Sequence, residues 1–354
     1  MDFGKVSESV LKRSVLKYVQ QNNKSVENAC HLIHEAKVGA DASLFAVSED
    51  YAASATAVAI GRHPMVAVEA IINACNNLIC SGAEPFGVQI ALVLPEAMYE
   101  SELRHVMEAA KNYSVEQQII MLGGHTTVSK FVTETVATVT ALGWVAQGAN
   151  VPCGERTASA DASGLQSKAV RSSALHPGMD VVMSKWIGLQ GTAKIAKEQK
   201  EELLKRLPAR FVAEAATYNK YMSIVPEARI ALREGAAALH DVSGGGIFRA
   251  LWELAERAET GIRIDLKKIP VKQETIEVCE VFGLNPYELL SGGALLMTAE
   301  DGEVLVEKLA AEGISAAVIG RLTDDNDRVI VTHGEEGDEL RYLDRPRTDE
   351  IDKV

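Results

Sequence analysis

The chain has 354 residues, 47% hydrophobic and 24% charged, which indicates a globular protein too long for one hydrophobic core. Its net charge of −13 argues against nucleic acid as the main partner, although a nucleotide can still bind through local donors and a metal. We expect a cytoplasmic protein with reduced thiols, because the five cysteines form no CxxC pair and the sequence shows neither a signal peptide nor an apolar run of transmembrane length.

The first predicted elements carry two candidate carboxylates. Residues 5–21 have the spacing of an amphipathic helix, and residues 43–48 read as a strand with Asp41 before it and Asp50 after it. Because a strand rises about 3.3 Å per residue, the two carboxylates lie too far apart to share one ion directly. Three readings remain: they serve different ions, they bind one large ligand, or they are simply loop aspartates.

Residues 63–82 form a long predicted helix with a proline in its first turn and a glycine at its end. Its middle is mostly apolar, so we expect it to be buried, with Asn76 and Asn77 interrupting that character near the end. Buried amides need hydrogen-bond partners, which are either structural groups or a ligand. Residues 87–94 follow as a strand too apolar for an exposed face.

A polar cluster follows the next predicted strand. After an amphipathic helix over residues 100–113, a buried strand over 118–122 leads into Gly123-Gly124-His125-Thr126-Thr127, and a further strand runs from 131 through 144. A strand that ends in glycines and polar side chains often presents groups to a ligand. His125 ligates a metal, moves a proton, or caps the turn.

Residues 146–176 are small and polar, and we place the domain boundary there, with a mobile loop as the alternative. The second half opens with a strand over residues 180–184. Lys185 ends that strand, and Gly188 and Gly191 lie in the turn into a helix. Since a helix start attracts anions, this turn is one candidate anion site, with Lys185 as its charge partner.

The strongest local motif is the glycine turn at residues 239–246. The polar residues Asp241 and Ser243 lead into Gly244, Gly245 and Gly246, and apolar residues then recur at helical spacing as far as residue 258. A helix start offers unpaired N–H groups, and glycines let an anion approach the backbone closely. The motif is either a phosphate site or a glycine-rich turn that caps a surface helix.

Alternating strands and helices continue to residue 323, with further helices over 200–218 and 227–235, and a strongly charged tail begins near residue 334. Both halves mix strands and helices, so we predict an α+β fold with two layers in each domain. The domains are an N-terminal one over residues 1–150, a C-terminal one over 170–335 and a charged tail over 336–354.

Several segments, in this order and spacing, resemble the AIR synthetase (PurM)-like superfamily, closest to its AIR synthase-related, HypE-like branch. The segments are GKVSESVLKR at 4–13, GADAS at 39–43, SED at 48–50, NNLICSGAEP at 76–85, GGHT at 123–126, HPGMDVVMSKWIGLQGT at 176–192, LHDVSGGGIFRALWELAE at 239–256 and GLNPYELLSGG at 283–293. Together they span nearly the whole chain. The superfamily also contains selenophosphate synthetase and thiamine-monophosphate kinase.

The resemblance implies an N-terminal sheet that builds a dimeric, barrel-like interface and a C-terminal α/β domain packed on it. It also implies that ATP and Mg²⁺ bind in a cleft and that the enzyme phosphorylates a substrate or activates a carbonyl-type oxygen. Carried over by motif, the implied metal ligands are Asp41 and Asp50, and the implied catalytic residues are Asp50, His125 and Lys185. The implied nucleotide- and substrate-binding residues are Asp41, Asn76, Asn77, Gly123, Gly124, Thr126, Gly188, Asp241, Ser243, Gly244, Gly245 and Gly246.

The chain departs from the family pattern in three places. Asn77 stands where the family usually has an acid, the cysteine-bearing tail of HypE has no counterpart after Cys279, and the N-terminal glycine-rich segment of several members is missing. The leading hypothesis is an ATP-dependent enzyme, a hydrogenase-maturation-like factor without that cysteine. A dimeric nucleotide-binding or scaffold protein with reduced catalysis is the second hypothesis, and a protein with an unrelated ligand in its interdomain cleft is the third.

Overall fold

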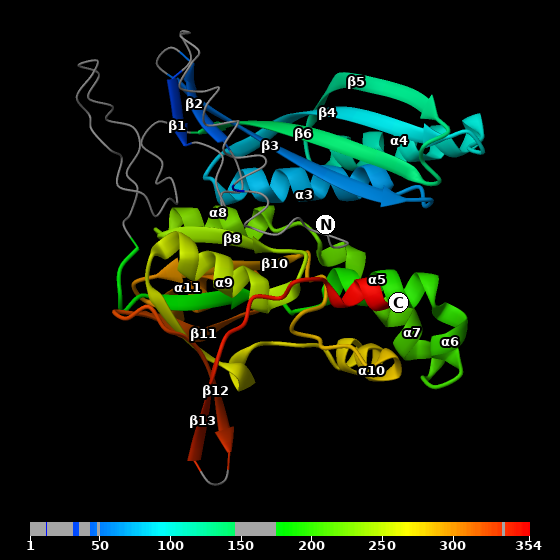
Figure 1. Cartoon of the computed structure of the whole chain (residues 1–354). Coiled ribbons are helices and arrows are strands. Elements are labelled where there is room, and N and C mark those ends of the chain that lie inside the picture. The colour runs from blue at the N-terminus through cyan, green and yellow to red at the C-terminus, as the bar shows by residue number, and fades with distance from the viewer. Residues whose placement is uncertain (1–11, 13–30, 35–42, 48–49, 146–174, 335–336) are drawn as a thin grey trace.

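The computed structural model describes residues 12, 31–34, 43–47, 50–145, 175–334 and 337–354. Asp41, nearly all of the predicted first helix and nearly all of the segment that we expected to contain the domain boundary lie outside these residues. The described chain forms two sheets, each with its own helices, stacked one above the other (Figure 1). Among the described residues, no helix combines the length and apolar character needed to cross a membrane.

The N-terminal sheet has six strands in the order β1-β2-β3-β6-β4-β5. Its strands are β1 (His31–His34), β2 (Ser43–Val47), β3 (Asp50–Gly61), β4 (Glu84–Pro95), β5 (Ile120–Ser129) and β6 (Thr135–Val145). Its helices are α3 (Val66–Cys80) and α4 (Glu100–Glu116), which lie on the same face of the sheet (Figure 1). Every neighbouring pair is antiparallel except β4 and β5, which are parallel.

Small alternating side chains allow α3 to pack closely on this sheet. Ala53 and Ala55 of β3 and Ala137 of β6 are buried in the core beneath α3, whereas Val58 and Ile60, on the opposite face of β3, are more than half exposed. This period-2 alternation gives one buried face and one open face. The described strands of the single chain form no closed barrel, so the expected barrel-like interface is not present within one subunit.

The C-terminal sheet has seven strands in the order β13-β12-β9-β11-β7-β10-β8. Its strands are β7 (Asp180–Ser184), β8 (Ala238–Val242), β9 (Gly261–Asp265), β10 (Ala294–Ala299), β11 (Ala316–Thr323), β12 (Arg328–Gly334) and β13 (Gly337–Tyr342). Its helices are α5 (Leu189–Glu198), α6 (Lys200–Leu204), α7 (Ala209–Ala215), η2 (Tyr218–Tyr221), α8 (Val225–Arg233), α9 (Gly246–Ala258), η3 (Leu266–Lys268), α10 (Gln273–Phe282), α11 (Gly302–Ala311) and η4 (Glu350–Lys353). One core layer contains α9, and another contains α8 and α11 on the opposite face.

The long helix α3 belongs to both domains. On one side it packs on β3 and β6, and on the other side it contacts β8 and α8 of the C-terminal domain. The side-chain amide of Asn76 donates to the Met222 carbonyl at 2.8 Å and accepts from the Ile224 N–H at 3.1 Å. Arg229 and Glu84 form an ion pair across the same boundary. The domains are therefore joined by buried packing and directed hydrogen bonds.

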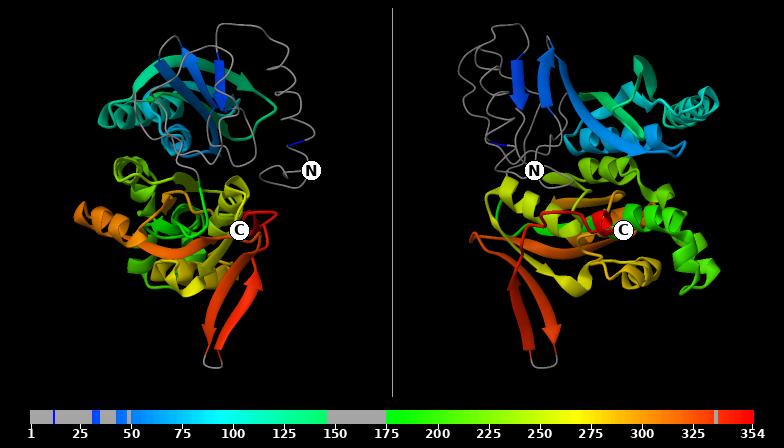
Figure 2. Two further views of the ribbon diagram at one scale, coloured as in Figure 1. Left: turned by 90° about the vertical axis from the view of Figure 1, so that its left-hand side faces the viewer. Right: turned by 45° about the vertical axis from the view of Figure 1, so that its right-hand side comes forward.

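Two predicted elements differ from the structure for identifiable reasons. The helix expected over residues 200–218 is broken into α6, α7 and η2, because Pro208 cannot continue a helix and adopts an extended ψ of 139° at the start of α7. The segment that we expected to be a charged tail begins with β13, an exposed strand that pairs with β12 in a hairpin extending from the domain (Figure 2). The chain after β13 then returns to pack beside α9.

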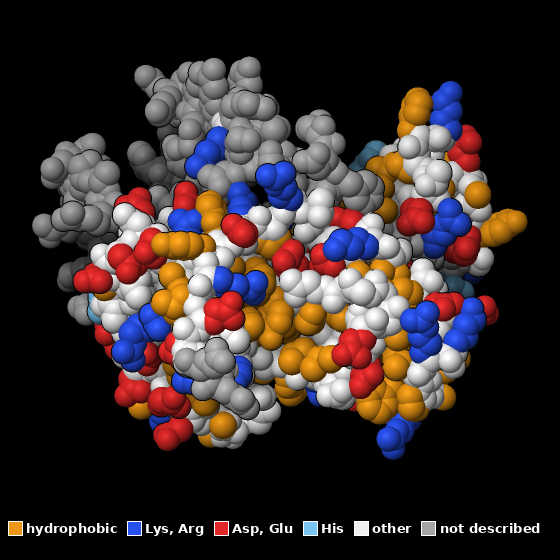
Figure 3. Space-filling view, turned by 60° about the horizontal axis from the view of Figure 1, so that its bottom comes forward, with side chains coloured by type: hydrophobic (Ala, Val, Ile, Leu, Met, Phe, Trp, Pro, Cys, Tyr) orange, Lys and Arg blue, Asp and Glu red, His pale blue; other side chains and the backbone are white. Residues whose placement is uncertain are grey.

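The underside of the molecule carries charged side chains of both signs. On the underside of the molecule, basic and acidic groups are interspersed around apolar areas and form no continuous basic face (Figure 3).

Candidate functional site

A cleft of about 1030 Å³ lies between the two domains, and it is the candidate functional site. Its N-terminal wall is the end of β3, the turn after it and the first turns of α3. Its C-terminal wall is α5 and the glycine turn before α9. The lining residues are Val58, Ala59, Ile60, Gly61, Arg62, His63, Pro64, Met65, Glu69, Asn73, Glu134, Gln190, Lys194, Lys197, Glu198, Asn219, Ser243, Gly244 and Leu290.

The glycine turn has the geometry that its sequence predicts. Gly245 and Gly246 have φ values of +83° and +65°, a region that favours glycine. A Cβ atom on Gly246 would lie 2.4 Å from the Tyr287 carbonyl oxygen, so no larger residue fits there without movement. Ser243 and Gly244 line the cleft, and among the described residues the Gly244 N–H and the Ser243 hydroxyl have no hydrogen-bond partner. These two donors are available to a ligand.

The next N–H of the turn already binds an anion that belongs to the protein. The Asp349 carboxylate accepts from the Gly245 N–H at 2.6 Å and from the Leu290 and Ile351 N–H groups, both at 2.9 Å. Burial raises the pKa of Asp349 above its ordinary value, and the three N–H donors oppose that shift. The start of α9 therefore does attract a carboxylate, and the residue that supplies it comes from the C-terminal segment.

Charged side chains face one another across the cleft. Glu69, on α3, is four-fifths buried, and its Oε2 atom lies 3.7 Å from Nε2 of His63. Burial raises the pKa of Glu69, while His63, Lys197 and Lys194 act in the opposite direction. Lys194 and Lys197 stand on the exposed face of α5, and neither forms a hydrogen bond or close ion pair with a described residue. A carboxyl group with a raised pKa beside an imidazole can exchange a proton, and the two ammonium groups can hold an anion.

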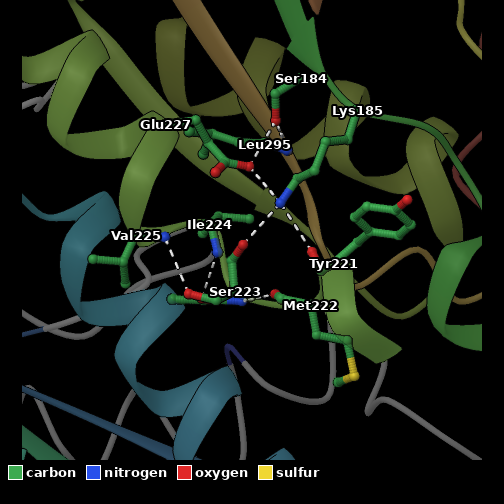
Figure 4. A network of polar contacts seen from close by, with 10 residues as sticks. Ser184, Lys185, Tyr221, Met222, Ser223, Ile224, Val225, Glu227 and Leu295 are labelled. Atoms are coloured by element: carbon green, nitrogen blue, oxygen red, sulfur yellow. Dashed lines mark hydrogen bonds and ion pairs between the residues drawn. The ribbon is translucent and has the colours of Figure 1, made fainter. Parts of the chain in front are cut away.

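Lys185, predicted as a catalytic residue, is committed to the protein interior (Figure 4). Its Nζ lies 2.6 Å from Oε1 of Glu227 and donates to the carbonyls of Tyr221 and Ser223 at 2.9 and 2.8 Å. The Ser184 hydroxyl also donates to Glu227, so the buried carboxylate has two partners. Burial lowers the pKa of Lys185, and Glu227 opposes that shift. With three acceptors around it, the ammonium has no donor left for a ligand.

Two other predicted residues, Asn76 and Gly188, use their polar groups within the protein. Asn76 satisfies both ends of its amide within the protein, so the structural reading of this residue holds, and Asn77 beside it is half-buried. The Gly188 N–H donates to the Ser291 hydroxyl at 2.7 Å, and a Cβ on Gly188 would lie 2.7 Å from a Thr275 methyl group.

The GGHT motif lies within β5 rather than after it. Gly123 and Gly124 have φ values of +130° and +151°, and the register of β5 shifts beside them. A Cβ on Gly124 would lie 1.8 Å from the Ile90 carbonyl oxygen, so this close approach requires glycine. His125 and Thr126 are exposed on this edge strand. The sequence missed the bulge because it depends on the pairing with β4.

One chain does not bring the remaining predicted residues together. The register places His125 level with Ala91, Thr138 and Val58 across four strands. Asp50 begins β3 and lies eight residues before Val58, or about 26 Å along the strand. Of Asp50 only the backbone is described, and Asp241 is half-buried on β8. The described residues contain no group of three His, Cys, Asp or Glu side chains that could hold a metal ion.

Of the residues that line the cleft, the sequence predicted only Ser243 and Gly244, and it missed the charged groups His63, Glu69, Lys194 and Lys197. One signal was available, because Glu69 is the only charged residue in the otherwise apolar α3. A lone charge in a buried helix requires a partner or a function. The two lysines gave no such signal, since charged residues on an exposed helix face are common.

Two family models match most of the chain. The N-terminal domain of AIR synthase related proteins matches residues 33–145, and the C-terminal domain of the same family matches residues 176–332. A putative hydrogenase expression/formation protein of Methanocaldococcus jannaschii is 26% identical over 289 residues, which cover 80% of this chain and 77% of that protein. The carbamoyl dehydratase HypE of Rhizobium leguminosarum bv. viciae is 25% identical over 264 residues, or 73% of this chain and 68% of that protein.

Solved structures share the same fold. A HypE-HypF complex superimposes with a TM-score of 0.67 and 19% identity, covering 87% of this chain and 94% of that chain. A hydrogenase maturation protein HypE in complex with ATP gives a TM-score of 0.65 and 17% identity, covering 97% and 95%. The two matched domains show that the chain belongs to the AIR synthase related protein family, and the similarity to the curated relatives places it in the HypE-like branch.

Proposed function

We propose that the protein is an ATP- and Mg²⁺-dependent cytoplasmic enzyme that phosphorylates a small molecule or a protein end, or activates its carbonyl-type oxygen. The observation that carries the proposal is the interdomain cleft, where the free Gly244 N–H and Ser243 hydroxyl lie near two lysines without close partners among the described residues. Support also comes from structural neighbours named as HypE bound to ATP and HypE bound to HypF.

The cleft suits phosphoryl chemistry for a physical reason. Phosphoryl transfer depends mainly on positioning and on neutralising negative charge. Lys194 and Lys197 supply two positive charges, and the glycine turn supplies backbone and hydroxyl donors. Glu69, paired with His63, is placed to accept or return the proton of an attacking group.

We further propose that two subunits complete the site. Asp50 and His125 lie too far apart in one chain to act on one ligand, so a symmetric partner is needed to bring them together. The open face of the N-terminal sheet offers a surface for this pairing, because Val58, Ile60 and Trp144 are each at least half exposed there. A two-fold axis across this face would form the barrel-like interface that the family resemblance implies.

The metal part of the proposal rests on residues beyond the described chain. Mg²⁺ prefers carboxylate oxygens and retained water, and the described residues hold no cluster of three suitable side chains. Asp41 and the Asp50 carboxylate, which the resemblance assigns to metal, lie outside the described atoms. When bound, the metal would neutralise phosphate charge.

The second candidate is a dimeric nucleotide-binding or scaffold protein with reduced catalysis. The observation in its favour is that three predicted ligand-binding groups are used by the protein itself. Lys185 pairs with Glu227, Asn76 joins the domains, and the Gly245 N–H binds Asp349. Each of these contacts stabilises the fold and leaves one group fewer for substrate.

Release of ADP from ATP and Mg²⁺ tests the first candidate. Lys194→Gln/Lys197→Gln should lower kcat/KM at least about tenfold, since each lysine supplies a charge-assisted contact. Lys111→Gln/Lys308→Gln, which replaces two exposed lysines on α4 and α11, is the matched control and should leave turnover unchanged. Calorimetry distinguishes the candidates: ATP that binds and is never consumed favours the scaffold, and a folded protein that binds no nucleotide contradicts both.

A further inference from the structure

A second groove lies on the C-terminal sheet, away from the interdomain cleft. It has a volume of about 290 Å³ and lies on β7, β9, β11 and β12. Asp180, Arg321 and Arg263 form a row across three neighbouring strands, because Arg321 pairs in register with both of the others. The row therefore contains two guanidinium groups and one carboxylate.

Both carboxylates of the groove are already satisfied by the protein. Asp180 accepts from Arg321 at 3.1 Å through Oδ1 and from the Gly302 N–H at 3.0 Å through Oδ2. Asp265 accepts from the Lys267 N–H at 3.0 Å and contacts His333 Nε2 at 3.1 Å. No oxygen of either carboxylate is left without a partner for a further cation.

Two cations of the groove, Arg263 and Lys268, are not satisfied in the same way. Arg263 and Lys268 are exposed, and neither side chain has a hydrogen bond or ion pair with a described residue. Arg263 also stands directly opposite Arg321, and like charges in that position repel each other. Hydrogen bonds to Asp338 and Asp265 raise the pKa of His333, which favours a further positive charge at the rim.

We propose that this groove is a binding site for a phosphate group, held by Arg263 and Lys268. An anion there would relieve the repulsion between the two arginines and pair with the planar guanidinium and the ammonium. The small volume suits inorganic phosphate or a phosphate ester with a few further atoms, rather than a nucleotide. The site is separate from the cleft and does not depend on the function proposed above.

Calorimetry with inorganic phosphate and with glycerol 3-phosphate at low salt tests this site, with glycerol as the uncharged control. Arg263→Gln/Lys268→Gln should weaken binding at least about tenfold, because it removes both unpaired cations. If glycerol 3-phosphate binds more tightly than inorganic phosphate, the ligand of the groove is a phosphate ester. If the two bind equally, the ligand is the inorganic ion.

Two control variants distinguish phosphate binding in this groove from an effect of net charge and from binding in the cleft. Lys111→Gln/Lys308→Gln also removes two positive charges, so it controls for net charge and should bind as the unaltered protein does. Lys194→Gln/Lys197→Gln removes the cleft lysines and should leave the groove's affinity for phosphate unchanged. Loss of function in the cleft can therefore be distinguished from loss of phosphate binding in the groove. Equal affinity in the Arg263→Gln/Lys268→Gln protein, with an unchanged thermal midpoint, or absence of phosphate binding to the unaltered protein, overturns the proposal.

Discussion

Replacing Lys185 by methionine tests whether this residue is structural. The Lys185 and Glu227 side chains are 10% and 2% exposed, and their charged atoms lie 2.6 Å apart. Removing the lysine leaves the buried carboxylate with only Ser184 and leaves two backbone carbonyls without their donor. Breaking one partner of a buried pair costs about 3–5 kcal/mol, so Lys185→Met should lower the free energy of unfolding by that amount.

Urea unfolding followed by circular dichroism measures this change. The double variant Lys185→Met/Glu227→Leu should recover much of the loss, because it removes both buried charges together. The charge-matched surface control Lys308→Gln should stay within about 0.5 kcal/mol of the unaltered protein. A loss below about 1 kcal/mol for Lys185→Met, or no recovery in the double variant, would refute the structural assignment.

Three further predictions concern the domain joint, the cleft and the sheet face. Asn76→Ala should cost about 2–4 kcal/mol in urea unfolding because it leaves two buried backbone groups unpaired, and Asn77→Ala should cost far less. Burial raises the pKa of Glu69 above its ordinary value of 4.5 in the folded state, so its ionisation should destabilise the fold as the pH rises above 4.5. Glu69→Gln should therefore reduce the fall in thermal midpoint above pH 4.5, and an unchanged pH profile contradicts this. Val58→Glu should shift sedimentation from dimer to monomer, while Val304→Glu, which replaces another exposed valine on α11, should not; identical sedimentation of both variants argues against the sheet face.

Local patterns predicted much of the fold. The apolar spacing after the glycine turn predicted α9, and the structure has it at Gly246–Ala258. The long apolar helix predicted over residues 63–82 is α3 at Val66–Cys80, with its last turn and its burial as expected. These elements could be predicted because the signals of helix starts, glycines and apolar periodicity extend over only a few residues.

The candidate site was harder to predict from the sequence because its contacts join residues that are far apart along the chain. Asp349 accepts a hydrogen bond from the Gly245 N–H although the two residues are 104 positions apart, and no local pattern around either residue predicts this contact. Asn76 finds its partners 146 and 148 residues away, so the sequence showed only that a buried amide needed some partner. The glycine turn predicts affinity for an anion, but its sequence could not indicate that the Gly245 N–H binds the Asp349 carboxylate.

Because α3 supplies core residues to both domains, it fixes the positions of the cleft walls even when no ligand is bound. Separating the domains would expose the side chains of Val68, Ile72 and Ile79 to water, and each of these is at most 6% exposed in the structure. Ligand entry should then require little rearrangement of the backbone, and crystals grown without ligand should tolerate soaking. Tight ligands for this pocket should accordingly be rigid molecules that match its shape as it stands.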